Sequence, residues 1–226
     1  MPQSPVEAPT PMLAALAAIK RDPSALAPLE VGAFGLALRL VTADDVADAT
    51  LIERLGAWRS EFMDNYPTQF PVTAEGTARW LRDHVLGDAD RLMFLIVDAA
   101  DPYGVAYGHI GLDHAHPSEP MLGISNVLKG DRERLPRGAM EAVEERMLAW
   151  AHEALGVVQI TAEIFEDNRP SRALHERLGF VQTGRRGLRR HVEGDRVVYR
   201  PLAAGDEAEP DRWWIRVVRP AERSPA

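Results

Sequence analysis

Apolar residues along this 226-residue chain recur with two different periods, and each change of period marks the border of an element. Spacings of three or four residues are typical of amphipathic helices. Helices are therefore predicted over 43–65, 74–86, 138–155 and 169–178. Short runs rich in β-branched and aromatic residues are typical of strands. Strands are therefore predicted over 34–42, 91–99, 104–115, 121–129, 157–165, 196–202 and 213–219. The order of these elements predicts one α/β domain with a mixed sheet.

The helix predicted over 138–155 has the clearest one-sided pattern. Its apolar stripe follows a period of 3.6 residues, whereas Glu141, Glu144 and Glu145 lie largely off that stripe. The stripe consists of Ala139, Val143, Met147, Trp150 and Ala154. The segment after the helix, 157–165, is β-rich and largely apolar, which is typical of a buried parallel strand.

Composition divides the chain into a leader, a main domain and a tail. Residues 1–33 are rich in Ala and Pro, and we expect a partly helical extension outside the main core. Residues 34–220 are assigned to the main domain and 221–226 to a C-terminal tail. The Ala-rich stretch 12–20 has no basic region before it, which argues against a signal peptide. No apolar run approaches the ~18 residues of a membrane span, so the sequence predicts a cytoplasmic protein.

Charge and cysteine content exclude several classes of function. The net charge is −8 and the isoelectric point is about 5.4, which argues against a general nucleic-acid-binding protein because such binding needs a broad basic surface. The chain has no Cys, so disulfides, thiolate zinc sites and cysteine nucleophiles are excluded. The acidic balance mildly favours a cationic partner.

The stretch FEDNRPSRALHERLGF, 165–180, contains an unusual polar stripe. Asn168, Ser171 and His175 are spaced i, i+3 and i+7, so they share one face of the predicted helix. That face is either an exposed surface or one wall of a binding cleft. Asn168 is also a natural N-cap, with Pro170 in the first turn and Gly179 at the helix end.

The second half of the chain carries a resemblance to a known family. The segments NVLK, RLPRGAMEAVEERMLAWAHEALGVVQITAEIF and DNRPSRALHERLGF are similar to the second half of GNAT-type (GCN5-related), acetyl-CoA-dependent N-acetyltransferases. The order of elements over 36–202 resembles that family as well. The resemblance implies a GNAT acyl-CoA N-acyltransferase fold, in which the parallel strands 121–129 and 157–165 splay apart and the pantetheine arm of the cofactor lies between them.

The resemblance also implies which residues hold the coenzyme. Backbone groups of Val127, Leu128 and Lys129 would pair with the pantetheine arm as if it were another strand. The pyrophosphate would lie over the start of the helix 138–155, where unpaired N–H groups favour an anion. The loop LPRGAM matches the family's phosphate loop at Gly138, followed by Ala139, but Leu135 replaces its leading basic residue and Met140 its final small residue. The cations available to the phosphates are Lys129, Arg132, Arg134 and Arg137. A solvated charged loop is the alternative interpretation.

In this resemblance the side chain of Asn168 faces the pantetheine, and Ser171 lies one turn further on. His175 stands where the family usually has a tyrosine that protonates the departing thiolate. An imidazolium can donate a proton near neutral pH. Alternatively, His175 is an exposed helix residue and the thiolate leaves into water.

A general base is needed because N-acylation requires a neutral amine. The stretch YGHIGLDHAH puts His109 and Asp113 on one face by the period of two residues, which suggests a base with an orienting carboxylate. Glu163 on the strand 157–165 is another candidate. The His-rich stretch 113–116 also has enough ligands for a metal, but no further ligand motif supports it and we expect no metal site.

The first half of the chain should bind the acceptor. The stretch WRSEFMDNYPTQF contains acidic groups that attract a cationic amine and aromatic rings on which a sugar can stack, and Asn126 lies where the preceding strand enters the cleft. The candidate substrate-binding residues are Trp58, Glu61, Tyr66 and Asn126. The expected reaction is direct transfer of an acetyl or short acyl group from acetyl-CoA to a primary amine of a small molecule, because no Cys is available for a covalent route.

Two alternatives remain open from the sequence: a coenzyme A-binding sensor without turnover, and an acyltransferase with a longer acyl donor. No nucleic-acid or membrane partner is expected, and a homodimer is compatible with the sequence.

Overall fold

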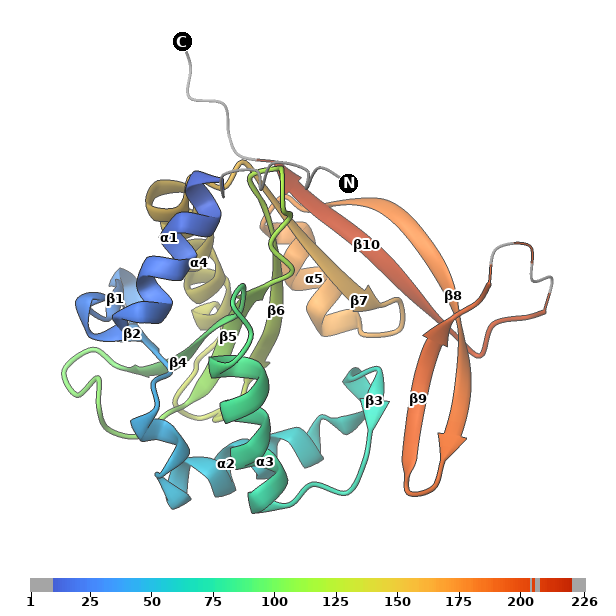
Figure 1. The fold of residues 1–226 in the computed structure, drawn as a ribbon, viewed down its shortest axis with the longest axis horizontal. Coiled ribbons are helices and arrows are strands. Elements are labelled where there is room, and N and C mark those ends of the chain that lie inside the picture. Colours follow the sequence, from blue (N-terminus) through green and yellow to red (C-terminus); the bar gives the residue numbers. More distant parts are fainter. Residues whose placement is uncertain (1–9, 204, 206–207, 221–226) are drawn as a thin grey trace, which may run out of the picture.

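The computed structural model describes residues 10–203, 205 and 208–220, which form one curved mixed sheet with helices on both faces (Figure 1). The sheet order is β1-β2-β4-β5-β6-β7-β10-β8-β9-β3. The strands are β1 Leu29–Val31, β2 Leu36–Leu40, β3 Thr68–Gln69, β4 Leu92–Asp98, β5 Gly108–Asp113, β6 Met121–Lys129, β7 Gln159–Phe165, β8 Val181–Glu193, β9 Arg196–Pro201 and β10 Arg212–Pro220. The α-helices are α1 Pro11–Arg21, α2 Ala49–Glu61, α3 Ala74–Trp80, α4 Ala139–Leu155 and α5 Arg169–Arg177. The predicted mixed α/β sheet is confirmed.

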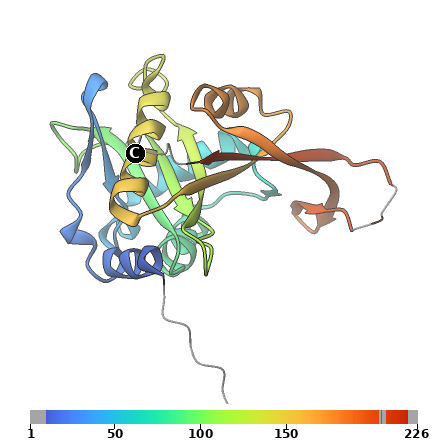
Figure 2. The same ribbon diagram turned by 90° about the horizontal axis from the view of Figure 1, so that it is seen from above.

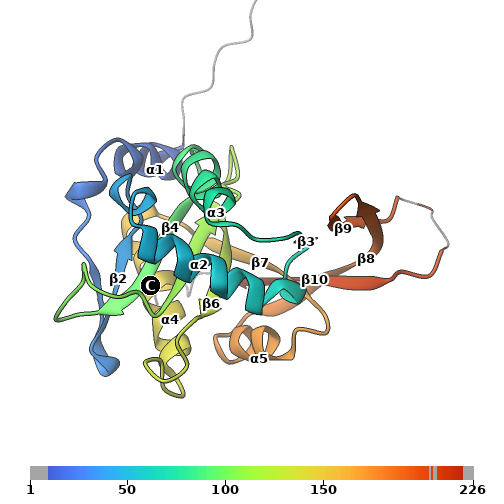
Figure 3. The same cartoon turned by 90° about the horizontal axis from the view of Figure 1, so that it is seen from below.

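Alternating residues of the central strands enter two separate cores. In β4, Leu92, Phe94 and Ile96 pack with α1 and α4, whereas the alternate residues of the strand pack with α2 and α3. Figure 2 shows α4 and α5 on one side of the sheet, and Figure 3 shows α2 and α3 lying across the other. Two-sided burial explains why β4 is continuously apolar. None of the described helices has both the length and the apolar character needed to cross a bilayer.

The N-terminal segment contradicts one expectation. Met12 and Leu16 of α1 are each 1% exposed and belong to the core that includes α4. β1 extends the sheet by pairing with β2. The expectation that this leader lies outside the main core is therefore wrong for residues 10–31. The predicted tail, 221–226, lies outside the described residues, and the exact domain limits stay a prediction.

Several predicted elements differ in extent. The helix predicted over 43–65 is shorter, because Asp48 caps α2 by accepting a hydrogen bond from Leu51 N at 3.1 Å and a 3₁₀ turn at 63–65 follows the helix. The strand predicted over 104–115 contains only β5. The sequence also missed β8, the longest strand described, most of whose residues are not buried.

The loop between α2 and α3 is tied to the far end of the sheet. Its short strand β3 pairs antiparallel with β9 through Thr68↔Val198 and Gln69↔Val197. Arg212, at the start of β10, donates to the Asp64 carbonyl at 2.5 Å and its guanidinium stacks 3.6 Å from the centre of the Phe165 ring. The loop therefore lies beyond the C-terminal end of β7, between α2 and β9 (Figure 1).

Candidate active site

The two parallel strands at the centre of the sheet separate along their length. β6 and β7 pair only at Met121↔Gln159, Leu122↔Ile160 and Gly123↔Thr161. β7 remains paired with β10 over its whole length, whereas β6 has no strand partner on its β7 side beyond Gly123 within the described chain. The predicted gap between strands 121–129 and 157–165 is confirmed. Backbone groups from Val127 to Lys129 line its edge.

β6 is irregular where it enters the gap. Its register against β5 shifts between His109 and Gly111, so that Asn126 and Val127 both fall opposite Ile110 as a β-bulge. Asn126 has φ 51°, a left-handed conformation that costs non-glycine residues roughly 1–3 kcal/mol and is concentrated at functional sites. Asparagine tolerates this conformation better than most residues.

His109 contacts the bulge. Its Nδ1–H donates a hydrogen bond to the Asn126 carbonyl at 2.6 Å, which fixes the tautomer because a carbonyl can only accept. Burial lowers the pKa of His109 to about 4, the bond to Asn126 raises it, and the Arg59 guanidinium lowers it further. The imidazole is therefore neutral at physiological pH, on the α2 side of the sheet against the Trp58 ring.

Asp113 does not pair with His109. The two side chains share a face of β5, but four residues of strand separate them by about 13 Å. The Asp113 carboxylate instead contacts His114 Nδ1 at 2.7 Å and Arg91 Nη2 at 3.5 Å, beside the closed end of the β6–β7 pair. The predicted base–carboxylate pair is wrong. No group of three His, Asp or Glu side chains suited to a metal occurs among the residues that the structure describes.

Glu163 lies on the face of β7 that is turned away from α4. Its neighbours Ala162 and Ile164 are buried in the core of α4, so the alternation of β7 directs Glu163 to the opposite face, where it is exposed. It has no ion-pair partner within the described part of the chain. Its role as a base stays a prediction.

The start of α4 has the features of an anion site. Gly138 precedes the helix with φ 86°, a conformation that favours glycine, and no side chain caps the helix. Ala139 is fully buried, and Arg137 is exposed beside the turn. Leu135, which replaces the family's basic residue, is fully buried in the core and therefore anchors the loop instead of contacting phosphate.

The other predicted phosphate ligands are partly engaged elsewhere. Arg132, predicted to bind phosphate, forms an ion pair at 3.3 Å with Glu61, predicted to bind the amine. Each side chain therefore neutralises the charge of the other. Arg134 lies 5.8 Å from the centre of the Tyr107 ring. Lys129 is half-buried opposite Gly108. Arg137 is therefore the best-placed exposed cation at the start of α4.

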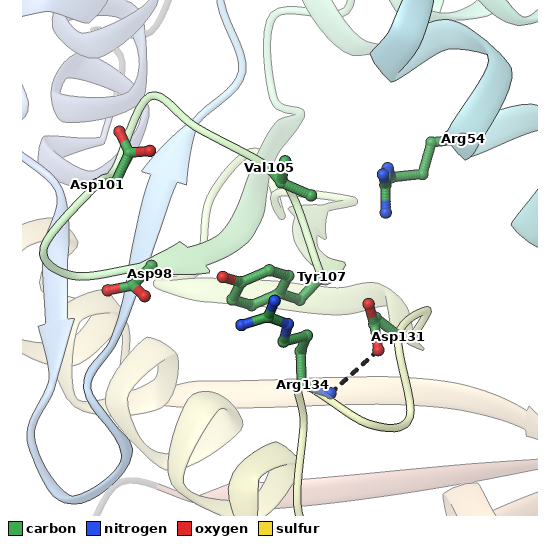
Figure 4. A pocket seen from close by; sticks show the side chains of 7 residues that line it. All are labelled: Arg54, Asp98, Asp101, Val105, Tyr107, Asp131 and Arg134. Atoms are coloured by element: carbon green, nitrogen blue, oxygen red, sulfur yellow. Dashed lines mark hydrogen bonds between the residues drawn. The ribbon is translucent and has the colours of Figure 1, made fainter.

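A cavity of about 330 Å³ lies beside this loop (Figure 4). Arg54 and Arg134 face carboxylates across it, and the Arg134 N–H donates to Asp131 Oδ1 at 3.0 Å. The cavity is lined by Arg54, Asp98, Asp101, Val105, Tyr107, Asp131 and Arg134. No lining residue comes from β7 or α5, so this cavity is separate from the gap between β6 and β7.

α5 begins as the sequence predicted. The Asn168 side-chain oxygen accepts a hydrogen bond from Ser171 N at 3.2 Å, and Pro170 occupies the first turn. Asn168 and Ser171 are half-buried at the open end of the gap. Capping is confirmed, and contact with the pantetheine stays a prediction.

Asn168→Ala is expected to lower the free energy of unfolding by about 1 kcal/mol, because the first turn of α5 loses its cap. Urea denaturation measures the change. Asn168→Asp provides the control, since a carboxylate accepts the same bond. Equal losses in both variants would contradict the capping role.

His175 lies between α5 and α4. Its Nδ1–H donates to the Ser171 carbonyl at 2.8 Å, and its Nε2 is 3.3 Å from Oε1 of Glu144. Burial lowers the pKa of His175, although the Ser171 bond raises it. Burial raises the pKa of Glu144 to about 8, although Arg219 lowers it. Burial therefore favours the neutral form of both groups.

This arrangement corrects two expectations. His175 is 3% exposed and lacks the partly charged imidazolium expected of an open site, and its role as an acid stays a prediction. Glu144 was expected off the buried stripe of α4 but is fully buried. The reason is that α4 packs against both the sheet and α5, which widens its buried face beyond the apolar stripe.

The residues predicted to bind the acceptor differ in their burial and contacts. Trp58 is 6% exposed and packs against His109 and Gly130, so the expectation that it stacks on a substrate is wrong. The Tyr66 ring is half-buried and lies 3.4 Å from the Arg59 guanidinium. Sequence reasoning missed Arg59, because only the fold brings its charge near His109.

Comparisons with known proteins agree with this geometry. The family model described as the acetyltransferase (GNAT) domain matches residues 36–181. A search of curated proteins finds no match. RimL, a ribosomal alpha-N-protein acetyltransferase solved in complex with coenzyme A, superimposes with a TM-score of 0.62 at 15% identity, over 86% of this chain and 98% of that chain. Spermidine N-acetyltransferase from Vibrio cholerae, solved with coenzyme A and spermine, gives a TM-score of 0.59 at 14% identity, over 82% of this chain and 95% of that chain.

At these identities the solved structures establish similarity of fold, and the family model covers more than half of the chain. The separated strands, the bulge and the uncapped glycine turn before α4 lie within the matched region. This chain therefore belongs to the GNAT acetyltransferase family, whose members use acetyl-CoA.

Proposed function

We propose that this acetyltransferase transfers the acetyl group directly to the primary amine of a small molecule, such as an amino sugar or an amino-acid-like metabolite. The observation that carries this proposal is the link between the α2–α3 loop and β9. The loop lies beyond the end of β7, next to the face that carries His109 and Glu163, which favours a small acceptor over a folded protein.

The features of the gap fit acetyl-CoA. The free edge of β6 offers backbone groups of Val127 and Lys129 to an extended amide-containing arm, as in strand addition. The uncapped start of α4 offers N–H groups and the positive end of the helix dipole to a pyrophosphate, with Arg137 beside it. Acetyl-CoA supplies an activated thioester, and the protein holds that thioester and the amine together.

Three groups of the chain act on the reaction in this proposal. The Val127 N–H at the bulge donates to the thioester carbonyl oxygen and stabilises the charge that develops there. Glu163 takes the proton of the amine through a water molecule. Because His175 is neutral and faces Glu144, the thiolate takes its proton from water.

Glu163→Gln is expected to lower kcat/KM for the amine about 10²-fold at pH 7, the lower end of the range for general bases because the residue acts through water. Steady-state kinetics with saturating acetyl-CoA measure this change. Glu153→Gln removes another exposed carboxylate, on α4, and is expected to retain full activity. If Glu163→Gln stays within twofold of the wild type, the base is another group.

A panel of acceptors tests the substrate class. Thiol release is measured with amino sugars, amino acids, polyamines and peptides with free N-termini, and the acetylated products are identified by mass. We expect turnover with an amino sugar or an amino-acid-like amine. Turnover with peptides alone would contradict the small-molecule acceptor. Tight binding of coenzyme A without turnover on any amine would contradict the whole proposal.

A further inference from the structure

We propose that His109 is a positioning residue that fixes the peptide between Asn126 and Val127, so that the Val127 N–H points into the gap between β6 and β7. This inference rests on the proposed function, in which that N–H polarises the thioester carbonyl. It assigns His109 a role other than the general base that the sequence suggested.

A hydrogen bond joins His109 to the bulge. His109 Nδ1–H donates to the Asn126 carbonyl at 2.6 Å, from a side chain that is 5% exposed. The contact joins β5 to β6 where the regular register of the two strands is interrupted. At this point the hydrogen bond from the His109 side chain replaces the regular backbone hydrogen bonds between β5 and β6.

The peptide bond between Asn126 and Val127 links this contact to the direction of the Val127 N–H. No cis peptide occurs among the described residues, so the Asn126 carbonyl and the Val127 N–H point in opposite directions. The carbonyl points toward His109 on β5. The Val127 N–H therefore points away from β5, to the side of β6 where β7 has diverged. The bond to His109 sets the direction of this donor.

Asn126 has an unusual backbone conformation. With φ at 51°, it lies in a region that an extended strand does not use, so the bulge needs support from outside its own backbone. His109 is the side chain that contacts the bulge carbonyl, and Trp58 packs against the imidazole. The Asn126 side chain donates to Ser125 Oγ at 3.2 Å and leaves the carbonyl to His109.

Two substitutions separate positioning from base catalysis. Asparagine presents its amide nitrogen near the place of Nδ1 and cannot act as a base, so His109→Asn retains the donor to the Asn126 carbonyl. Glutamine presents its amide group near the place of Nε2, so His109→Gln lacks that donor. Neither variant carries a group that titrates.

The experiment measures two quantities for wild type, His109→Asn and His109→Gln. The first is the carbonyl stretching frequency of bound acetyl-CoA labelled with ¹³C at the thioester carbon, recorded by infrared difference spectroscopy without an amine. The second is kcat at saturating acetyl-CoA. In the wild type, we expect the carbonyl stretching frequency of bound acetyl-CoA to be lower than that of free acetyl-CoA, because the Val127 N–H polarises the carbonyl. We expect His109→Gln to lose this lowering of the frequency and to lose about 10²-fold in kcat, with KM for acetyl-CoA changed little. His109→Asn is expected to restore both to near the wild-type values.

Equal losses of kcat in both variants with an unchanged carbonyl frequency would overturn the inference and identify His109 as the base. Asn126→Val gives an independent test, since a β-branched residue disfavours positive φ and His109 stays intact. It is expected to lose the lowered frequency, and retention of that frequency would overturn the inference even if His109→Gln does not fold. Because the infrared measurement needs no amine, a failed acceptor panel leaves this test decisive.

Discussion

Glu144→Gln is expected to remove a loss of stability that the wild type shows between about pH 5 and pH 8. Burial raises the pKa of Glu144 from 4.5 to about 8 in the folded protein. Below pH 4.5 the group is protonated in both states, so the folded protein carries no penalty there. As the pH rises toward 8, the unfolded chain ionises first and the folded state loses relative stability, until the folded group ionises as well.

The size of this effect follows from the same interval. One pH unit between the two pKa values corresponds to about 1.4 kcal/mol, so the interval from 4.5 to about 8 corresponds to about 5 kcal/mol. His175 acts in the opposite sense, because its lowered pKa costs stability as the pH falls below 6.5. His175 lies 3.3 Å from Glu144, so the difference between wild type and Glu144→Gln reports on the pair of groups. Arg219 on β10 is the other charged group that acts on the Glu144 carboxyl.

Urea denaturation of wild type and Glu144→Gln at pH 5, 6.5 and 8 measures the effect as a widening difference in the free energy of unfolding. Glu145→Gln is the matched control, since Glu145 is exposed on the same helix. It is expected to follow the wild-type pH profile. Parallel profiles for wild type and Glu144→Gln would show that the buried carboxyl does not titrate as described.

Trp58→Ala is expected to lower the free energy of unfolding by about 3–5 kcal/mol, the usual cost of removing a buried large aromatic side chain. The ring is 6% exposed, lies 6.1 Å from the His109 ring, and approaches Gly130 so closely that a Cβ there would come within 2.1 Å of it. The tryptophan therefore fills the space between α2, β5 and the end of β6.

Urea denaturation and amine kinetics distinguish this role from substrate stacking. Trp213→Ala is the control, because Trp213 is only half-buried and should cost less stability. Gly130→Ala is expected to destabilise the protein for the opposite reason, since the added methyl group overlaps the Trp58 ring. A small loss of stability together with a large rise in KM for the amine would return Trp58 to the acceptor site.

Local features of the fold could be predicted from the sequence. The continuous apolar run of β4 reflects burial on both faces, and the apolar stripe of α4 reflects its contact with the sheet. Asn168 was identifiable as a cap because its bond reaches only three residues along the chain. Such signals involve neighbours in sequence, so spacing and residue type are enough to reveal them.

The strand β8 and the burial of α1 were missed because their signals are weak. β8 is rich in Arg and mostly exposed, and it is held by pairing with β10 and β9 rather than by an apolar face. In α1, Met12 and Leu16 form a narrow stripe within an Ala-rich helix, and only the packing against α4 shows that this stripe is core.

The sequence named candidate residues for the site but did not predict their contacts. His109 lies on the α2 side of β5, and its partner is a carbonyl on β6 that depends on a register shift. Glu144 on α4 and His175 on α5 come into contact where the two helices pack together. The 3.6-residue period of α4 by itself predicts that the Glu144 carboxyl lies off the buried stripe. Contacts between distant segments depend on register and helix packing, which a single sequence leaves open.

The ladder between β3 and β9 is the shortest in the described sheet, with two aligned residue pairs. Separating it would break few main-chain hydrogen bonds, each worth about 1 kcal/mol, and would leave the other pairings intact. This pairing is thus the strand contact that would be lost first on local unfolding, and its loss would leave the β6–β7 gap unchanged.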